Sequence, residues 1–440
     1  MSGFSELAHA ATEALRARPL VPLALATLVE VEGSSYRQPG ARLLVDAEAR
    51  VLAGAISGGC LEGDVAARAA DVCGQRRAIT LRYDLRDDLE TIWGFGSACD
   101  GIAHIVLEPL PDAEWLNTAA AICHARHGGA VLTVIPETKS ASAAAADHAG
   151  GTRRSAGTIA LLHGQASTGS WERVEFDRDD VNRENVLAPA VRARAAPLVD
   201  AAQKTAHAAL EERQDALHED VHNALRGSSS ARSRYFVEPL MPVVSLYLIG
   251  AGRGAEAFAR IASAIGWEVT VIDHRPSLLE ALTLPDGVRV HCARAEQCAR
   301  DGGVEIVTDE RTAVALLTHI FDVDAAWLRT LLPQSLGYLG VLGSRQRAAR
   351  LLDEVAPTIA ALGPAGRVLH APIGLDLGGE TPESIALAAV AEIEAVMNGR
   401  PGGFLRERES PIHTRTPTPD VRPAALVVDL GQCTLRVDDE

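Results

Sequence analysis

Hydrophobic and polar positions in the first 110 residues predict a mixed domain of short strands and helices. Apolar residues at helical spacing predict a helix over 5–17, and a nearly unbroken apolar run predicts a buried strand over 23–31. The same patterns predict a helix over 65–73 and strands over 41–46, 50–53, 78–83 and 102–107. Loops rich in turn-forming residues separate these elements, and two of them, 54–64 and 94–101, combine several glycines with one cysteine.

The pattern beyond residue 240 changes to a regular alternation of strands and helices. The predicted strands lie at 243–249, 268–273, 313–317, 336–342 and 367–370. The predicted helices lie at 254–265, 324–332, 345–355 and 382–397. Such alternation is typical of a parallel sheet with crossover helices. The predicted fold class is therefore α/β, with a mixed N-terminal domain and a Rossmann-like, doubly wound C-terminal domain.

Composition changes along the chain predict the domain limits. The N-terminal domain is assigned to 1–136, and the Ala/Ser/Gly-rich stretch 137–157 is predicted to be a flexible insertion. The range 158–226 is assigned to the rest of that domain, with an amphipathic helix near 197–225. A Gly/Ser-rich linker is placed at 227–233, the Rossmann-like domain at 234–400 and a disordered, proline-containing tail at 401–440.

Charge and cysteine content narrow the class of protein. The chain has 42 Lys+Arg and 58 Asp+Glu, a net charge of −16, which argues against a general nucleic-acid binder because phosphates require a basic surface. No apolar run is long enough to span a membrane, and the first residues lack the pattern of a signal peptide. The 7 cysteines form no CxxC pair, which favours reduced thiols. A cytoplasmic location is expected.

A glycine-rich loop after the first strand of the C-terminal domain predicts a nucleotide-like ligand. The segment Gly250-Ala-Gly-Arg-Gly-Ala255 satisfies the G-x-G-x-x-G/A pattern through Gly250, Gly252 and Ala255. Asp273 supplies the acidic residue expected about 20 positions later. Arg275 leaves the choice between a ribose hydroxyl and an extra phosphate open. A Rossmann scaffold that serves only a structural purpose remains the alternative.

Cys60 is the predicted reactive residue of the N-terminal domain. It lies in Ser57-Gly-Gly-Cys-Leu-Glu-Gly-Asp64 before a predicted helix, a position that lowers a thiol pKa and suits a sulfur carrier, nucleophile or soft-metal ligand. Gly58, Gly59 and Glu62 are expected to shape this loop. A small residue packed in a tight turn is an equally weighted alternative. Cys99 is similar, whereas the remaining cysteines placed in regular elements, Cys73, Cys123, Cys292 and Cys298, are predicted to be buried small hydrophobes.

Two further loops follow predicted strands of the C-terminal domain, Gly340–Arg345 and His370–Gly378. Each is expected at the carboxyl edge of the sheet, where ligands bind in open α/β folds. Arg345 is a candidate contact for an anionic group, and His370 or Asp376 for a polar ring. Capping and solvation explain each residue singly almost as well. The chain has no Ser-His-Asp order, no Walker loop and no HExxH motif.

Taken together, these motifs resemble the XdhC/CoxI family of accessory proteins for molybdenum hydroxylases. The resemblance rests on motifs that occur in family order in both halves: Glu30–Arg42, Ile56–Asp64, Phe236–Leu240, Gly250–Ala255, Gly266–Pro276, Leu317–His319, Leu339–Arg345, Ala371–Gly378 and Thr381–Ala386. Arg253 and Gly254 stand where the family often has His and Val. The resemblance makes 1–136 an XdhC/CoxI-like domain.

The resemblance implies a maturation factor rather than a metabolic enzyme. Such a protein would bind the molybdenum cofactor, a molybdopterin that can carry a cytosine dinucleotide, support its sulfuration by a cysteine desulfurase, and insert it into an apo xanthine dehydrogenase or related enzyme. Cys60 would contact molybdenum or relay sulfur, and Gly58, Gly59 and Glu62 would lie beside the cofactor. Gly250, Gly252, Asp273, Arg345 and Asp376 would hold its nucleotide-like end. A homodimer is also implied.

Two other hypotheses remain open at this stage. An NAD(P)-dependent oxidoreductase is compatible with Gly250–Ala255 and Asp273, although no proton donor paired with a substrate arginine is evident. An interaction scaffold with an empty Rossmann domain is the third hypothesis.

Overall fold

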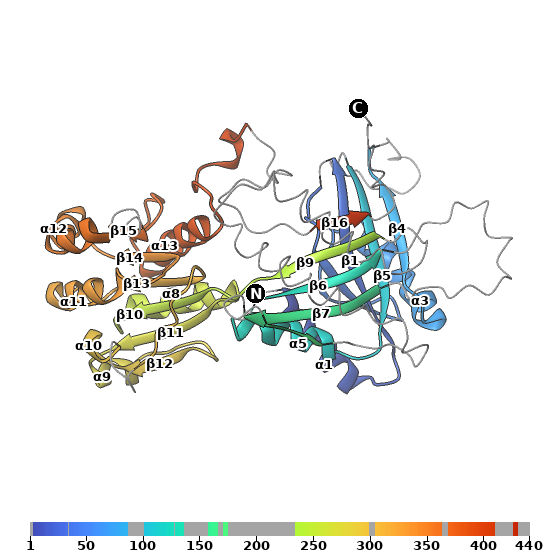
Figure 1. Ribbon diagram of the computed structural model, residues 1–440, viewed down its shortest axis with the longest axis horizontal. Helices are drawn as coiled ribbons and strands as arrows, with labels where there is room; N and C mark the ends of the chain where they lie inside the picture. The colour runs from blue at the N-terminus through green and yellow to red at the C-terminus, as the bar shows by residue number, and fades with distance from the viewer. Residues whose placement is uncertain are drawn as a thin grey trace, which may run out of the picture. The chain divides into compact units, whose positions relative to one another are not determined.

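The chain forms two compact units, each described here by itself (Figure 1). The computed structural model describes residues 3–33, 35–86, 101–126, 128–135, 157–165, 170–174, 234–298, 304–362, 368–409 and 426–429. The first unit comprises Ser2–Pro242 and receives a strand from the C-terminal region, and the second comprises Val243–Ile412.

The first unit contains an antiparallel sheet with the order β3-β2-β1-β5-β4. Its strands are β1 (Leu23–Gly33), β2 (Arg42–Asp46), β3 (Val51–Gly54), β4 (Ile79–Asp84) and β5 (Gly101–Leu110). The first seven residues of β1 are all buried, as its continuous apolar sequence predicts. A core cluster that includes Leu28, Leu43 and Ile105 packs between this sheet and the helices after β3.

Four helices accompany the first unit: α1 (Gly3–Ala17), α2 (Glu62–Ala67), α3 (Ala69–Gln75) and α5 (Glu114–His124). The single helix predicted over 65–73 is wrong, because two short helices occupy this region and meet at Arg68. The first begins at Glu62, whose carboxylate binds the preceding loop and fixes the chain before the apolar periodicity starts.

A second antiparallel sheet completes the first unit, with the order β16-β9-β6-β7-β8. Its strands are β6 (Gly128–Ile135), β7 (Gly157–Gln165), β8 (Ser170–Val174), β9 (Arg234–Leu240) and β16 (Leu426–Asp429). Val29 and Val106 of the first sheet pack against Ile135 and Phe236 of the second, so the two sheets share a core.

This second sheet corrects two predicted domain limits. The strand β9, which the linker signal assigns to the Rossmann-like domain, pairs with β6 of the first unit instead. The tail predicted to be disordered contributes β16, which pairs with β9. In both cases a partner strand distant in sequence provides the hydrogen bonds, and local composition does not reveal such a partner. The insertion at 137–157, except Gly157 at the start of β7, lies outside the described residues, as do the helix near 197–225 and the linker at 227–233.

The second unit is a doubly wound α/β domain, as predicted. Its six strands are all parallel in the order β12-β11-β10-β13-β14-β15. They are β10 (Ser245–Ile249), β11 (Glu268–Asp273), β12 (Arg289–Cys292), β13 (Thr312–Leu316), β14 (Tyr338–Val341) and β15 (Leu369–His370). The order reverses between β10 and β13, which places a topological switch point at the ends of these two strands.

Helices cover both faces of this sheet (Figure 1). The helices are α8 (Arg253–Ala264), α9 (Pro276–Glu280), α10 (Ala295–Cys298), α11 (Phe321–Leu331), α12 (Arg345–Leu362), α13 (Pro382–Met397) and the 3-10 turn η4 (Leu405–Glu407). One core cluster joins Phe258 of α8 and Ile393 of α13 to the sheet, and another joins Trp327 of α11 and Leu351 of α12 to it. These clusters make the sheet a rigid support for the loops at its carboxyl edge.

Candidate functional site

The Cys60 loop is built around the carboxylate of Glu62. Oε1 of Glu62 accepts hydrogen bonds from the backbone N–H groups of Ile56 at 3.1 Å and Ser57 at 2.8 Å. Oε2 accepts from the backbone N–H of Leu61 at 3.2 Å and from the Ser57 hydroxyl. The Ser57 oxygen in turn accepts from the backbone N–H of Gly59 at 3.1 Å. These bonds close the loop from 56 to 62 on itself.

The charge of Glu62 is part of this arrangement. Burial raises the pKa of this carboxyl, but the hydrogen bonds from Ser57 and the neighbouring backbone outweigh burial and lower it below its ordinary value. Because both oxygens are occupied by the loop, Glu62 acts on any ligand by positioning the loop rather than by direct contact.

Cys60 lies at the tip of this loop and is half-buried. Gly58 and Gly59 beside it are exposed, and a side chain added at Gly59 would meet no atom within 4 Å. Open space therefore adjoins the segment that carries the thiol. The helix that follows, α2, has 6 residues, so the expected effect of a helix dipole on the thiol is weaker than a longer helix would give.

Tyr36 and Arg37 lie beside this loop and were missed by the sequence analysis as site residues. The Tyr36 ring lies 3.7 Å from the position that a Cβ on Gly58 would occupy, and its side chain is 64% exposed. The Arg37 guanidinium carbon lies 5.8 Å from the centre of that ring. An aromatic residue in a loop of turn formers was the available signal, because a large exposed ring is unusual outside binding surfaces.

The other cysteines differ in their surroundings. Cys99 lies outside the described residues, so its predicted role stays a prediction. Cys123 is buried, as predicted, and Cys73 is half-buried, where burial raises its pKa and its thiol donates to the carbonyl of Leu23 at 3.2 Å. Cys298 is also half-buried, and burial raises its pKa to about 11. The prediction for Cys292 is wrong: it ends β12, an edge strand, and is exposed.

The glycine-rich loop of the second unit lies at the topological switch point. Gly250 follows β10 with a φ of +122°, and a Cβ there would lie 2.8 Å from the carbonyl carbon of Leu317 and the nitrogen of Thr318. Only glycine permits this backbone angle and this approach of the loops after β10 and β13. Gly252 caps α8 and is exposed, and a Cβ at this position would meet nothing within 4 Å. The loop is thus closed on its β13 side and open at Gly252.

Asp273, at the end of β11, holds the glycine-rich loop in place. Its Oδ2 accepts the backbone N–H of Ala251 at 2.7 Å and Nη2 of Arg275 at 2.8 Å. Its Oδ1 accepts the backbone N–H and Nε of Arg275, both at 2.9 Å. Burial raises the pKa of this carboxyl, but the Arg275 and Ala251 bonds prevail and bring it to about 2.

These contacts leave Asp273 with 0% side-chain exposure. The oxygens that would receive a ribose hydroxyl in a dinucleotide-binding protein are therefore occupied by the chain itself. In contrast, the Arg275 side chain is 36% exposed and presents a positive charge at this edge. The site as folded favours an anionic group over a ribose diol.

The remaining predicted residues lie on loops at the carboxyl edge of the same sheet. Arg345 begins α12 and is exposed, and Asp376 lies exposed in the loop after β15. His370 is fixed more firmly: its Nδ1 lies 3.0 Å from Oε1 of Glu392, and its ring stacks on Tyr338 with centroids 4.3 Å apart. Glu392 also accepts bonds from the Tyr338 hydroxyl at 3.0 Å and from the backbone N–H of Gly374.

Glu392 was missed by the sequence analysis, since it lies in a helix far along the chain from His370. Burial raises its pKa, but the bonds from His370, Gly374 and Tyr338 lower it below the ordinary value. The cluster therefore fixes the loop that begins at His370 and carries Asp376.

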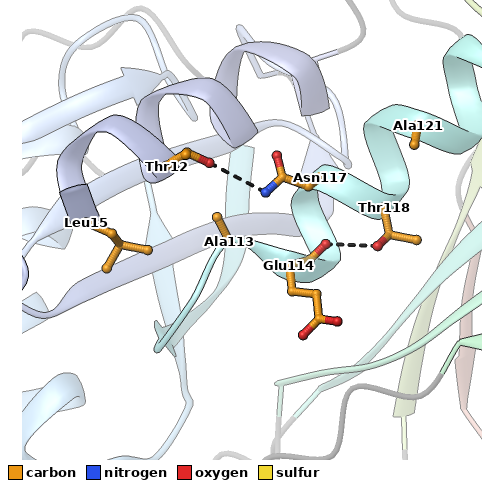
Figure 2. Close-up of a pocket in the computed structure, with 7 residues that line it drawn as sticks. All are labelled: Thr12, Leu15, Ala113, Glu114, Asn117, Thr118 and Ala121. Atoms are coloured by element: carbon orange, nitrogen blue, oxygen red, sulfur yellow. Dashed lines mark hydrogen bonds between the residues drawn. The ribbon is translucent and has the colours of Figure 1, made fainter.

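Other parts of the described chain offer less chemistry. An open hollow between α1 and α5 is lined by Thr12, Leu15, Ala113, Glu114, Asn117, Thr118 and Ala121 (Figure 2). Thr12 and Asn117 meet across it at 3.5 Å, and Glu114 is the single ionisable side chain among these residues. Within the described residues, no cluster of three or more His, Cys, Asp or Glu side chains is arranged to hold a metal ion. No described helix is long and apolar enough to cross a membrane.

These features define a two-unit α/β protein in which one unit carries a thiol on an open glycine loop and the other is a Rossmann domain with a cationic edge. Residues 17–84 match the model of the XdhC and CoxI family, and residues 246–393 match the model of the XdhC Rossmann domain. The chain belongs to the XdhC/CoxI family.

Individual relatives agree with this membership. A protein of Bacillus subtilis (strain 168), named there as a probable xanthine dehydrogenase component, is 27% identical over 84% of this chain and 91% of its own length. "Uncharacterized protein YqeB" of Escherichia coli (strain K12) is 34% identical over 38% of this chain and 30% of its own length. A crystal structure titled as a xanthine dehydrogenase from Bacillus halodurans has the same fold. It superposes with a TM-score of 0.60, at 22% identity, over 94% of this chain and 98% of that one.

Proposed function

We propose that this protein is a molybdenum-cofactor chaperone that supports sulfuration of the cofactor and its insertion into an apo molybdenum hydroxylase of the xanthine dehydrogenase type. A cysteine desulfurase supplies the sulfur, and the protein works in the cytoplasm, as a homodimer. The cofactor is cargo rather than a resident group, because an insertion factor must release what it binds.

The observation that carries the proposal is the pairing of the Cys60 loop with an XdhC Rossmann domain in one chain. Cys60 lies beside open space at Gly59, so a bulky ligand can approach the thiol without displacing a side chain. A thiolate is a ligand suited to molybdenum and a carrier suited to sulfur. The family matches in both units, in the family order, support the same role.

The residues around Cys60 divide the work between contact and positioning. Cys60 makes the contact with the metal or sulfur end of the cargo, and the exposed backbone of Gly58 and Gly59 lets that end approach closely. Glu62 holds the loop through four hydrogen bonds to Ile56, Ser57 and Leu61. No side-chain rearrangement is needed for the cargo to enter or leave.

In the Rossmann unit, Gly250 and Gly252 give the phosphate-bearing end of the cargo access to the backbone, while Arg275 and Arg345 provide positive charge at the same edge. Asp273 contributes by fixing the loop and Arg275. Asp376 contacts the cargo from the loop after β15. This use of Asp273 weakens the alternative of an NAD(P)-dependent oxidoreductase, which needs a carboxylate free for the ribose.

The test is the molybdenum and pterin content of the protein purified from a cofactor-producing host. Wild type is compared with Cys60→Ala, and Cys73→Ala serves as a matched control because Cys73 donates its thiol to a carbonyl within the fold. We expect cofactor in wild type and in the control and its loss in Cys60→Ala. A second assay measures the sulfido-cofactor content of a xanthine dehydrogenase produced with and without the protein.

Two outcomes would contradict the proposal in different ways. Retention of cofactor by Cys60→Ala at the wild-type level would move the site away from the thiol. Absence of cofactor from every sample, even after incubation with excess cofactor, together with an unchanged target enzyme, would reject the chaperone function. Nicotinamide titration would then test the oxidoreductase alternative.

A further inference from the structure

The loop after β13 stands opposite the glycine-rich loop at the switch point of the Rossmann unit. Gly250 approaches the backbone of Leu317 and Thr318 so closely that a Cβ would lie 2.8 Å away. The next residue, His319, therefore follows the part of the loop that borders the crevice between β10 and β13. Ligands of open α/β sheets bind in this crevice.

His319 has a strained backbone and an exposed side chain. Its φ is +57°, in the left-handed region that L-residues other than glycine, asparagine and aspartate rarely occupy. The residue is exposed, and no described residue forms a hydrogen bond with its imidazole. Histidine thus occupies a position that glycine would fill with less strain, and its side chain makes no contact that explains the choice. Strained residues of this kind occur at ligand-binding positions.

A buried network beneath the loop maintains this conformation. The Thr318 hydroxyl donates to Oδ1 of Asp324 at 2.5 Å and accepts the backbone N–H of Ile320 at 3.1 Å, so it brackets His319 on both sides. Asp324, with 0% side-chain exposure, also accepts Nη2 of Arg347 at 2.7 Å. Three elements, the β13 loop, α11 and α12, therefore hold the turn at His319 through side chains that do not reach solvent freely.

The charges at this edge favour an anion in the crevice. The two carboxylates beneath the loops, Asp273 and Asp324, both have 0% side-chain exposure and are paired with Arg275 and Arg347. Arg253, at the start of α8, is exposed. Although the chain carries a net charge of −16, these buried carboxylates present no free oxygen to a ligand, and the exposed groups include cations.

We propose that His319 is a ligand-contacting residue of the Rossmann unit, whose imidazole donates a hydrogen bond to the phosphate group of the cofactor held at the Gly250 loop. This assignment rests on the proposed chaperone function. The strained turn directs the imidazole toward the crevice, and the Thr318–Asp324–Arg347 network keeps it there before the ligand arrives, which lowers the entropy lost on binding.

The experiment separates the imidazole from the strain that it imposes. His319→Gly removes the side chain and relieves the left-handed backbone, while His319→Asn keeps a hydrogen-bond donor that tolerates this backbone. Arg76→Gly is the matched control, because Arg76 has a φ of +48° at the exposed end of α3 in the first unit. Affinity for purified molybdenum cofactor and the thermal unfolding midpoint are measured for each full-length variant.

We expect His319→Gly to bind the cofactor about ten-fold or more weakly while its unfolding midpoint rises, and His319→Asn to recover most of the affinity. Arg76→Gly is expected to raise the midpoint with wild-type binding. Wild-type affinity in His319→Gly would overturn the assignment. A fall in both affinity and midpoint for His319→Gly would also overturn it, since that result indicates a structural role. If wild type itself binds no cofactor, the proposed function fails and this inference with it.

Discussion

Asp273→Asn provides a quantitative test of how the Rossmann loop is held. The substitution keeps the size of the side chain but removes the charge that binds Arg275 and the backbone N–H of Ala251. The difference between the ordinary pKa of 3.8 and the folded value of about 2 converts to about 2 kcal/mol of folding free energy at ~1.36 kcal/mol for each pKa unit. Because Arg275 is 36% exposed, solvent screening makes this figure an upper value.

The pH dependence follows from the sign of that difference. A carboxyl whose pKa is lower in the folded state stabilises the protein above its unfolded value and loses this contribution as the pH falls through the folded value. For Asp273 the window therefore runs from 3.8 down to about 2. The full loss in Asp273→Asn is expected at pH 7, and about half of it near pH 3.

The assay must report on the second unit alone. Urea unfolding followed by hydrogen exchange in the strands Ser245–Ile249 and Glu268–Asp273 meets this need, because both strands belong to the Rossmann sheet. Asp286→Asn is the matched control, since Asp286 is exposed in the same unit, and it should change stability by less than about 0.5 kcal/mol. A loss in Asp273→Asn no larger than in this control, or one that is the same at pH 3 and pH 7, would refute the reasoning.

Three further substitutions test other contacts. Gly250→Ala should destabilise the Rossmann unit by more than about 2 kcal/mol in urea unfolding, because its Cβ would meet backbone atoms at 2.8 Å, whereas Gly254→Ala should be tolerated, since nothing lies within 4 Å. Glu62→Gln should lower stability by about 1–3 kcal/mol and reduce cofactor retention, measured as pterin content; unchanged values would contradict its positioning role. Glu392→Gln should destabilise most at neutral pH, with the loss narrowing as pH falls below 4.5, and a pH-independent loss in urea unfolding would contradict this.

The Rossmann unit shows how much local pattern can predict. Its strands are short apolar runs buried on both faces, such as Ser245–Ile249, and these runs alternate with amphipathic helices. The predicted limits of the helix Pro382–Met397 agree with the structure, because Thr381 caps its start through the N–H of Ser384 and Asn398 follows its end. Caps and periodicity are local properties of the chain, so the sequence is sufficient to find them.

The first unit shows the opposite case. Strands β9 and β16 pair through residues that are nearly two hundred positions apart along the chain, and no local signal joins Arg234–Leu240 to Leu426–Asp429. The break between α2 and α3 likewise depends on bonds from Glu62 to residues before the helix. Pairing partners and register are set by packing across the whole unit, which is why the predicted domain limit at 234 was wrong.

Sequence alone determined which residues carry the chemistry: a thiol in a glycine loop at Cys60, a phosphate-type loop at Gly250, and the acidic residue Asp273 at the expected distance. Residue type and spacing are sufficient for this because they are written in the chain. The tertiary structure decided what each residue is free to do. Asp273 is taken by Arg275 and Ala251, Glu62 is taken by its own loop, and His319 is left exposed in a strained turn. The physical reason is that a polar group's availability depends on the partners that folding brings to it, and those partners come from segments that local pattern does not connect.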